Sequence, residues 1–200
     1  MKCPGQDTRY WKEDAIFEVR CPRCGRLVEF FKDDTARTCP GCGERLPNPR
    51  LDFGCAAYCP YAEQCLGSLP PELKEKQQAV FKERIEAEVT HRLRDDSRAL
   101  ERLRLRLKYA EQIALEEGGQ LPVVLAAACL WGWEEPAAFL KSLNIPIELQ
   151  QEILKALQGQ NQEGKMVHDA ELLTSQALGQ EVRGAPQTTV GKRLLATLSF

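Results

Sequence analysis

Two copies of the motif Cys-x-x-Cys-Gly lie near the N-terminus: CPRCG, with Cys21 and Cys24, and CPGCG, with Cys39 and Cys42. Each motif makes a tight turn that directs two thiolates to one point, and the final glycine lets the backbone curl under a metal. The 14 residues between Cys24 and Cys39 include the strand-like stretch RLVEFF, which indicates a β-hairpin. Two such turns complete a tetrahedral set of four thiolates, so the sequence predicts a zinc ribbon.

Four further cysteines lie near these motifs, out of nine in the chain. In a chain without an export signal, clustered cysteines are more often metal ligands than disulfides. The set consists of Cys3, Cys55, Cys59 and Cys65, the last three within GCAAYCPYAEQCLG. Its spacing does not identify one kind of site: an iron–sulfur cluster of the 4Fe–4S type, a second zinc or no metal all stay open. Cys129, in an apolar run, is most simply a small buried hydrophobic residue.

The chain after residue 69 has the pattern of a helical protein. The Pro pair of LPPEL suits a helix start, and apolar residues then recur at helical spacing as far as residue 113. The polar stretch DDS at 95–97 divides this region into two helices. Five more helices are expected at 121–132, 134–143, 146–158, 167–178 and 186–199. We therefore expect a mainly α protein, with the zinc ribbon and the second cysteine set in residues 1–69 and an all-α domain in residues 70–200.

Composition argues against several classes of partner. The net charge is only −2, so no strong overall field draws the chain to nucleic acid or to a membrane. Residues 1–70 carry ten basic and ten acidic residues, which favours protein over nucleic acid as a partner. The N-terminal stretch lacks the apolar segment of a signal peptide, and the longest apolar run has 13 residues, too few to cross a bilayer. We expect a cytoplasmic protein with protein partners.

Several stretches of the helical part resemble the HD-domain metal-dependent phosphohydrolases. They are LERLRLRLKYAEQIALEEGGQLPVVLAAACLWGW, HDAELL and TTVGKRLLATL. The stretches KCPGQDTRYWK and FFKDD are similar to a bacterial subgroup of that family with an N-terminal zinc ribbon. The resemblance implies an HD-like fold for residues 70–200. In active members it also implies a site of imidazoles and carboxylates whose metals activate water and stabilise phosphate charge.

Most metal ligands of that family are missing from this chain. The position of the first His falls on Arg102, and the His-Asp pair falls on Trp131 and Gly132. Arginine is cationic at any relevant pH and tryptophan offers only an N–H donor, so neither binds a metal. Only the last Asp matches, at Asp169. We interpret Asp169 as the remnant of a lost metal site, His168 as incidental, and the tryptophans as filling the vacated cavity.

A row of arginines suggests another use for the same region. If Arg102 faces the former pocket, then Arg98, Arg102 and Arg106 could bind a small phosphorylated ligand without catalysis. The simpler interpretation is a solvated helix face that pairs with neighbouring acidic residues.

The sequence therefore predicts a non-catalytic metal-binding protein with an interaction or regulatory role, or a role as a subunit of a larger complex. Two alternatives remain. One is a residual phosphohydrolase in which His168 and Asp169 hold a weakly bound metal. The other is a redox or assembly module with an iron–sulfur cluster on the second cysteine set.

Overall fold

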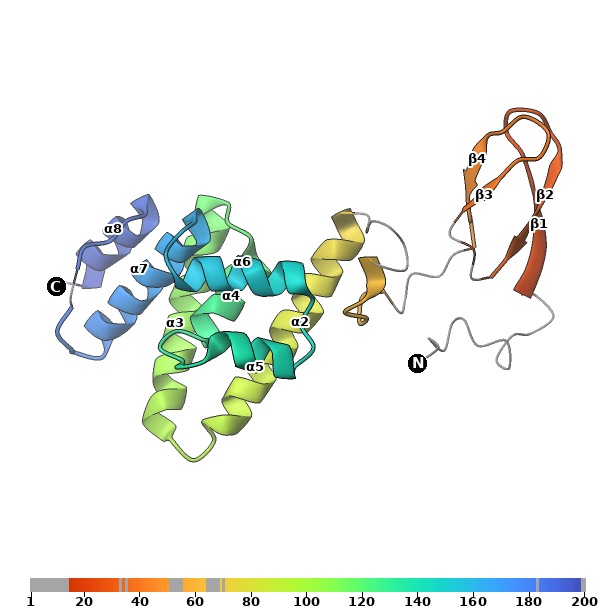
Figure 1. The fold of residues 1–200 in the computed structure, drawn as a ribbon. Helices are drawn as coiled ribbons and strands as arrows, with labels where there is room; N and C mark the ends of the chain where they lie inside the picture. The colour runs from red at the N-terminus through yellow and green to blue at the C-terminus, as the bar shows by residue number, and fades with distance from the viewer. Residues whose placement is uncertain are drawn as a thin grey trace. The chain divides into compact units, whose positions relative to one another are not determined.

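Each Cys-x-x-Cys-Gly motif forms the turn of its own antiparallel β-hairpin in the computed structural model, which describes residues 15–32, 34, 36–50, 56–63, 69, 71–182 and 184–198. Strand β1 (Ile16–Arg20) pairs with β2 (Leu27–Phe31) across the first motif. Strand β3 (Ala36–Thr38) pairs with β4 (Arg45–Pro47) across the second (Figure 1). The strand character of LVEFF was predicted from the sequence, whereas the second hairpin was not.

The two hairpins, residues 16–47, form a small ribbon with one core. That core is built on the alternation of side chains along the strands. Phe17 of β1 and Phe30 of β2 point inward as an opposed pair, and their rings stack with centroids 5.8 Å apart. The core also contains Val28 and Leu46, together with the two cysteines that begin the motifs, Cys21 and Cys39. A core of this size stabilises a fold only weakly, and small domains commonly add a metal or a disulfide to such a core.

The rest of the chain is all-α, with seven helices among the described residues. They are α2 (Pro71–Arg92), α3 (Ser97–Glu117), α4 (Leu121–Cys129), α5 (Pro136–Ser142), α6 (Ile147–Leu157), α7 (Gln162–Ala177) and α8 (Thr189–Leu198). The predicted fold class, mainly α with a small cysteine-bearing β region, is confirmed.

Helix α4 forms the centre of the helical domain. It is apolar on every side and packs against α2, α3, α6 and α7. All its residues from Val123 to Cys129 are buried, as is Leu130 after it, which is the environment that a helix without a polar face requires. The helix ends earlier than the predicted residue 132, and Gly132 takes a left-handed conformation, with φ of 77°.

Helix α7 begins five residues before the predicted start. The side chain of Asn161 accepts a hydrogen bond from the backbone N–H of Gly164 at 2.9 Å and so caps the helix. As a result, His168 and Asp169 lie in the middle of α7 and not at its beginning.

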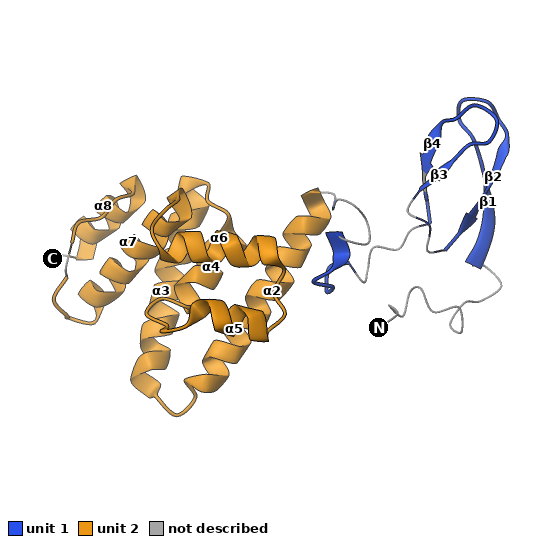
Figure 2. Cartoon of the chain, viewed as in Figure 1, with its two compact units in different colours: residues 1–69 blue, residues 70–200 orange. Residues whose placement is uncertain are grey.

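The chain divides into two compact units, Met1–Leu69 and Pro70–Phe200 (Figure 2). Each has its own hydrophobic core. None of the described helices combines the length and the apolar composition that crossing a membrane would need.

Candidate metal centre

The four motif cysteines converge on one point. Their sulfur atoms all lie within 4.8 Å of one another, and these residues come in pairs from the two hairpin turns. The sulfurs of Cys21 and Cys42 are 3.6 Å apart, and those of Cys24 and Cys39 are 3.5 Å apart. In a tetrahedral zinc site with Zn–S bonds of about 2.3 Å, neighbouring sulfurs lie about 3.8 Å apart. The cysteine set therefore has the size of a zinc site.

The two turns share one backbone design. In the first, the N–H of Gly25 donates to the carbonyl of Cys21 at 2.8 Å; in the second, the N–H of Gly43 donates to the carbonyl of Cys39 at 2.9 Å. Both glycines have positive φ, 72° and 74°, which residues with a side chain adopt at a cost. The Cys-x-x-Cys-Gly spacing thus specifies the position of both sulfur pairs, which is why the sequence alone could predict them.

The protonation of the site depends on its backbone donors and on its crowding. The pKa of Cys39 is lowered to about 7, chiefly because the backbone N–H of Gly41 lies 3.4 Å from its sulfur. The backbone N–H of Glu44 lowers the pKa of Cys42, but burial and the three neighbouring thiols outweigh it and raise the value to about 12. Four thiols this close cannot all ionise unless a cation compensates their charge, and a divalent metal supplies that charge.

The other cysteines are not assembled into a site by the described residues. Cys59 lies half-buried in a turn within residues 56–63. Its proposed companions Cys3, Cys55 and Cys65 lie outside the described residues. Cys129 is buried in the helical core, as expected from the sequence.

Asp169 has a structural role in this chain. Its side chain is fully buried, and its carboxylate accepts hydrogen bonds from the backbone N–H groups of Gln187 and Thr188, at 2.8 and 2.7 Å, and from the Thr188 hydroxyl at 2.7 Å. Nδ1 of His168 lies 3.3 Å from Oδ1 of Asp169. A metal at Asp169 would have to displace these donors.

These bonds anchor the start of helix α8. Thr188 is the N-cap: its hydroxyl oxygen accepts from the N–H of Gly191 at 2.9 Å. The N–H of Val190 donates to Glu117 of α3 at 2.7 Å. A Cβ at position 191 would lie only 2.2 Å from Oδ2 of Asp169, so glycine is required there. Thr188 and Glu117 were not predicted from the sequence, although threonine just before a helical apolar pattern is a common N-cap.

Two of the three arginines considered for anion binding are engaged elsewhere. Arg106 is buried; its Nε donates to the Ala128 carbonyl at 2.6 Å and its Nη1 to Glu171 at 3.0 Å. Arg102 donates to the same Glu171, and also to Ser175 and Gln180. Glu171 thus forms an ion pair with each of the two guanidinium groups. Arg98 is exposed on α3, one helical turn before Arg102.

Trp131 and Trp133 are only partly buried. Trp131 meets the ring of His168 edge-on, with centroids 6.4 Å apart. Trp133 packs against Phe139 with ring centroids 5.1 Å apart, and the Arg92 guanidinium lies 5.9 Å from its ring. Within the described ranges, the four motif cysteines are the only group of three or more His, Cys, Asp or Glu side chains close enough together to hold a metal ion.

No protein-family model, no curated protein and no solved structure matches this chain.

Proposed function

We propose that the protein binds one structural zinc ion through Cys21, Cys24, Cys39 and Cys42 and acts as a non-catalytic interaction protein. The convergence of four sulfurs within 4.8 Å of one another carries this proposal. Two of these cysteines, Cys21 and Cys39, are also part of the buried core of the ribbon. A metal that joins them would therefore hold the two hairpins together, which is the role of structural zinc in small domains.

The surface of the cysteine-bearing unit supports a docking role. Large apolar or aromatic side chains are exposed there: Ile16 and Leu27 on the first hairpin, and Tyr58 and Tyr61 in residues 56–63. Tyrosines are enriched at protein interfaces, and exposed apolar side chains gain stability when a partner covers them. This favours a protein partner over nucleic acid.

We further propose that the helical domain is a degenerate HD-like domain. The positions that correspond to the family's ligands come from α3, the end of α4 and α7, and these three helices pack against one another. Arg102 reaches Glu171 and Ser175 of α7, and Trp131 meets His168. The described side chains at those positions form ion pairs and ring contacts, which supports a domain that has lost catalysis.

Metal analysis of the purified protein tests the zinc assignment. We expect one zinc per chain, lost in Cys24→Ser and in Cys42→Ser because three thiolates bind zinc more weakly than four. Cys129→Ser is the matched control, since Cys129 lies in the other unit, and its zinc content should equal that of the wild type. Zinc that persists in both ribbon variants would overturn the assignment.

A second measurement addresses the alternatives. We expect no hydrolysis of p-nitrophenyl phosphate with Mn²⁺, Mg²⁺ or Co²⁺, and no visible absorbance after anaerobic purification. Phosphatase activity that disappears in Asp169→Ala together with a bound non-cysteine metal would establish the hydrolase instead. Visible absorbance that disappears in Cys59→Ser would establish the iron–sulfur module.

A further inference from the structure

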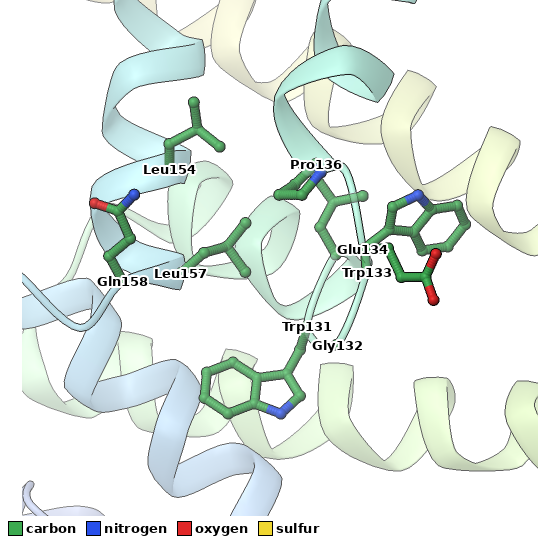
Figure 3. A pocket seen from close by; sticks show the side chains of 9 residues that line it. Trp131, Gly132, Trp133, Glu134, Pro136, Leu154, Leu157 and Gln158 are labelled. Atoms are coloured by element: carbon green, nitrogen blue, oxygen red, sulfur yellow. The ribbon is translucent and has the colours of Figure 1, made fainter.

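A groove opens on the helical domain between helix α6 and the turn that joins α4 to α5. Its volume is about 510 Å³. Figure 3 shows Leu154 and Leu157 of α6 on one side, Pro136 on the other, and Trp131 at one end. These four side chains are half-buried, and each leaves part of its apolar surface open to solvent. A concave surface of this volume with apolar walls is the form of many binding sites.

Trp131 has unused binding capacity in this groove. Its neighbour Trp133 is engaged by Phe139 and Arg92, whereas the ring contact of Trp131 is the edge of His168. In the part of the chain that the structure describes, the indole N–H of Trp131 donates to no acceptor. A half-buried indole with a free donor is typical of the side chains that dominate the energy of protein interfaces.

One carboxylate lies on the rim of the groove. Glu134 lines the groove, is exposed, and makes no ion pair with any described residue. Arg92 of α2, which lies over the ring of Trp133, pairs with Glu88 at 3.0 Å. The free carboxylate next to apolar walls is complementary to an occupant that is apolar with a basic group beside its apolar part.

The shape of the groove favours a polypeptide over a small molecule. Small-molecule sites enclose most of their ligand's surface. Here Gly132, Glu134 and Gln158 are exposed and the apolar lining is half-exposed, so a small ligand would keep much of its surface in water. A polypeptide segment that lies across the groove can insert side chains between Leu157 and Pro136 and cover the rim at the same time.

We propose that this groove docks a segment of a partner protein that presents two or more large apolar side chains and an adjacent lysine or arginine, the latter paired with Glu134. The inference rests on the non-catalytic interaction role proposed above but uses residues of the other unit. Trp131 and Leu157 contact the apolar side chains, and Glu134 selects the charge.

Selection from a phage-displayed random dodecapeptide library tests this. The zinc-loaded full chain is the target, and the Leu157→Glu variant serves to remove peptides that bind elsewhere. We expect enriched peptides that combine Leu, Ile, Phe or Trp with a neighbouring Lys or Arg. In fluorescence anisotropy, Leu157→Glu and Trp131→Ala should weaken binding by about tenfold or more, as expected for interface anchors. Circular dichroism establishes that these variants keep their helices.

Leu115→Glu is the matched control, because Leu115 is 66% exposed on α3 and does not line the groove. It should bind the selected peptides like the wild type. The Glu134→Lys variant, changed at an exposed position, should bind the basic peptides more weakly. It should bind more tightly the versions of these peptides in which Glu replaces the basic residue. Failure to enrich peptides over the Leu157→Glu target, enrichment of acidic peptides, or no change of charge preference in Glu134→Lys would overturn the proposal. Zinc content measured on the same samples reports separately on the proposed function.

Discussion

Thr188 donates both its backbone N–H and its hydroxyl to Oδ2 of Asp169, each at 2.7 Å. The residue that resembles the last metal ligand of a phosphohydrolase therefore holds the first turn of helix α8 against α7. Carboxylates favour helix N-termini because the free N–H groups and the helix dipole attract negative charge. These hydrogen bonds account for a carboxylate that is buried in the interior of the domain.

Asp169→Asn should destabilise the helical domain. The amide group offers fewer acceptors than the carboxylate and brings N–H groups against the donors of Gln187 and Thr188, so we expect a loss of roughly 2–4 kcal/mol in the free energy of unfolding. Urea denaturation followed by circular dichroism measures it. Glu111→Gln, an exposed change on α3, is the control and should shift the free energy by less than about 0.5 kcal/mol. Equal free energies of unfolding for Asp169→Asn and Glu111→Gln would show that the hydrogen bonds to Asp169 contribute nothing to stability.

Glu171→Ala should cost more than Arg102→Ala. Without Glu171, the buried Arg106 keeps one partner, the Ala128 carbonyl, and carries an uncompensated charge. We expect a loss of roughly 3 kcal/mol for this variant. Arg102 is about a third exposed, and its removal leaves Glu171 paired with Arg106, so the cost should be about 1 kcal/mol. Denaturant titration of both variants checks the order, and a larger loss for Arg102→Ala would contradict it.

Removal of zinc should unfold the ribbon and leave the helices. The two units have separate cores, and the proposed zinc ligands Cys21 and Cys39 belong to the core of the ribbon. Treatment of the zinc-loaded protein with a strong chelator should therefore abolish the dispersed amide signals of β1 to β4 in NMR spectra, because structural zinc supplies much of the folding energy of such units. The helical ellipticity should change little. Loss of helix in parallel with the ribbon signals would mean that the units fold together.

Cys129 should resist thiol reagents in the native protein. Burial raises its pKa to about 12, with Glu86 adding a smaller increase. At pH 8 its thiolate fraction is then on the order of one in ten thousand, and the thiolate is the reactive form. Iodoacetamide labelling followed by peptide mass spectrometry should find Cys129 unmodified in the native chain and modified in denaturant. Because the native pKa lies above the value of an unfolded thiol, stability should fall as pH rises between 9 and 12. Native labelling at pH 8 would show that the α4 core opens.

The sequence predicted the ribbon site well because its geometry is local. In each motif the two cysteines are three positions apart, and the glycine that completes the turn follows the second cysteine directly. Cys21, Cys24, Cys39 and Cys42 could therefore be interpreted as one set. The apolar run of α4 was equally informative, since its composition requires burial.

Long-range pairing could not be predicted in the same way. Glu171 lies 69 residues after Arg102 and 65 after Arg106, and helical spacing suggested neutralisation by neighbouring acidic residues instead. Asp169 was interpreted as a remnant because its position matches the last ligand of the resembled family. Its hydrogen-bond donors could not be predicted, since they come 18 and 19 residues later and their position depends on how α8 packs. Such contacts follow from tertiary packing, which no spacing rule encodes.

The thiolate site is enclosed unevenly. Cys21 and Cys39, one from each hairpin, are buried, Cys42 is half-buried, and Cys24 is exposed. A chelator, an oxidant or an acceptor protein therefore reaches Cys24 first. After Cys24 dissociates from a bound metal, the other three ligands would still join both hairpins. The rate of metal exchange should thus be governed by one outer cysteine, whereas the equilibrium affinity is governed by all four, and the two quantities can evolve separately in this chain.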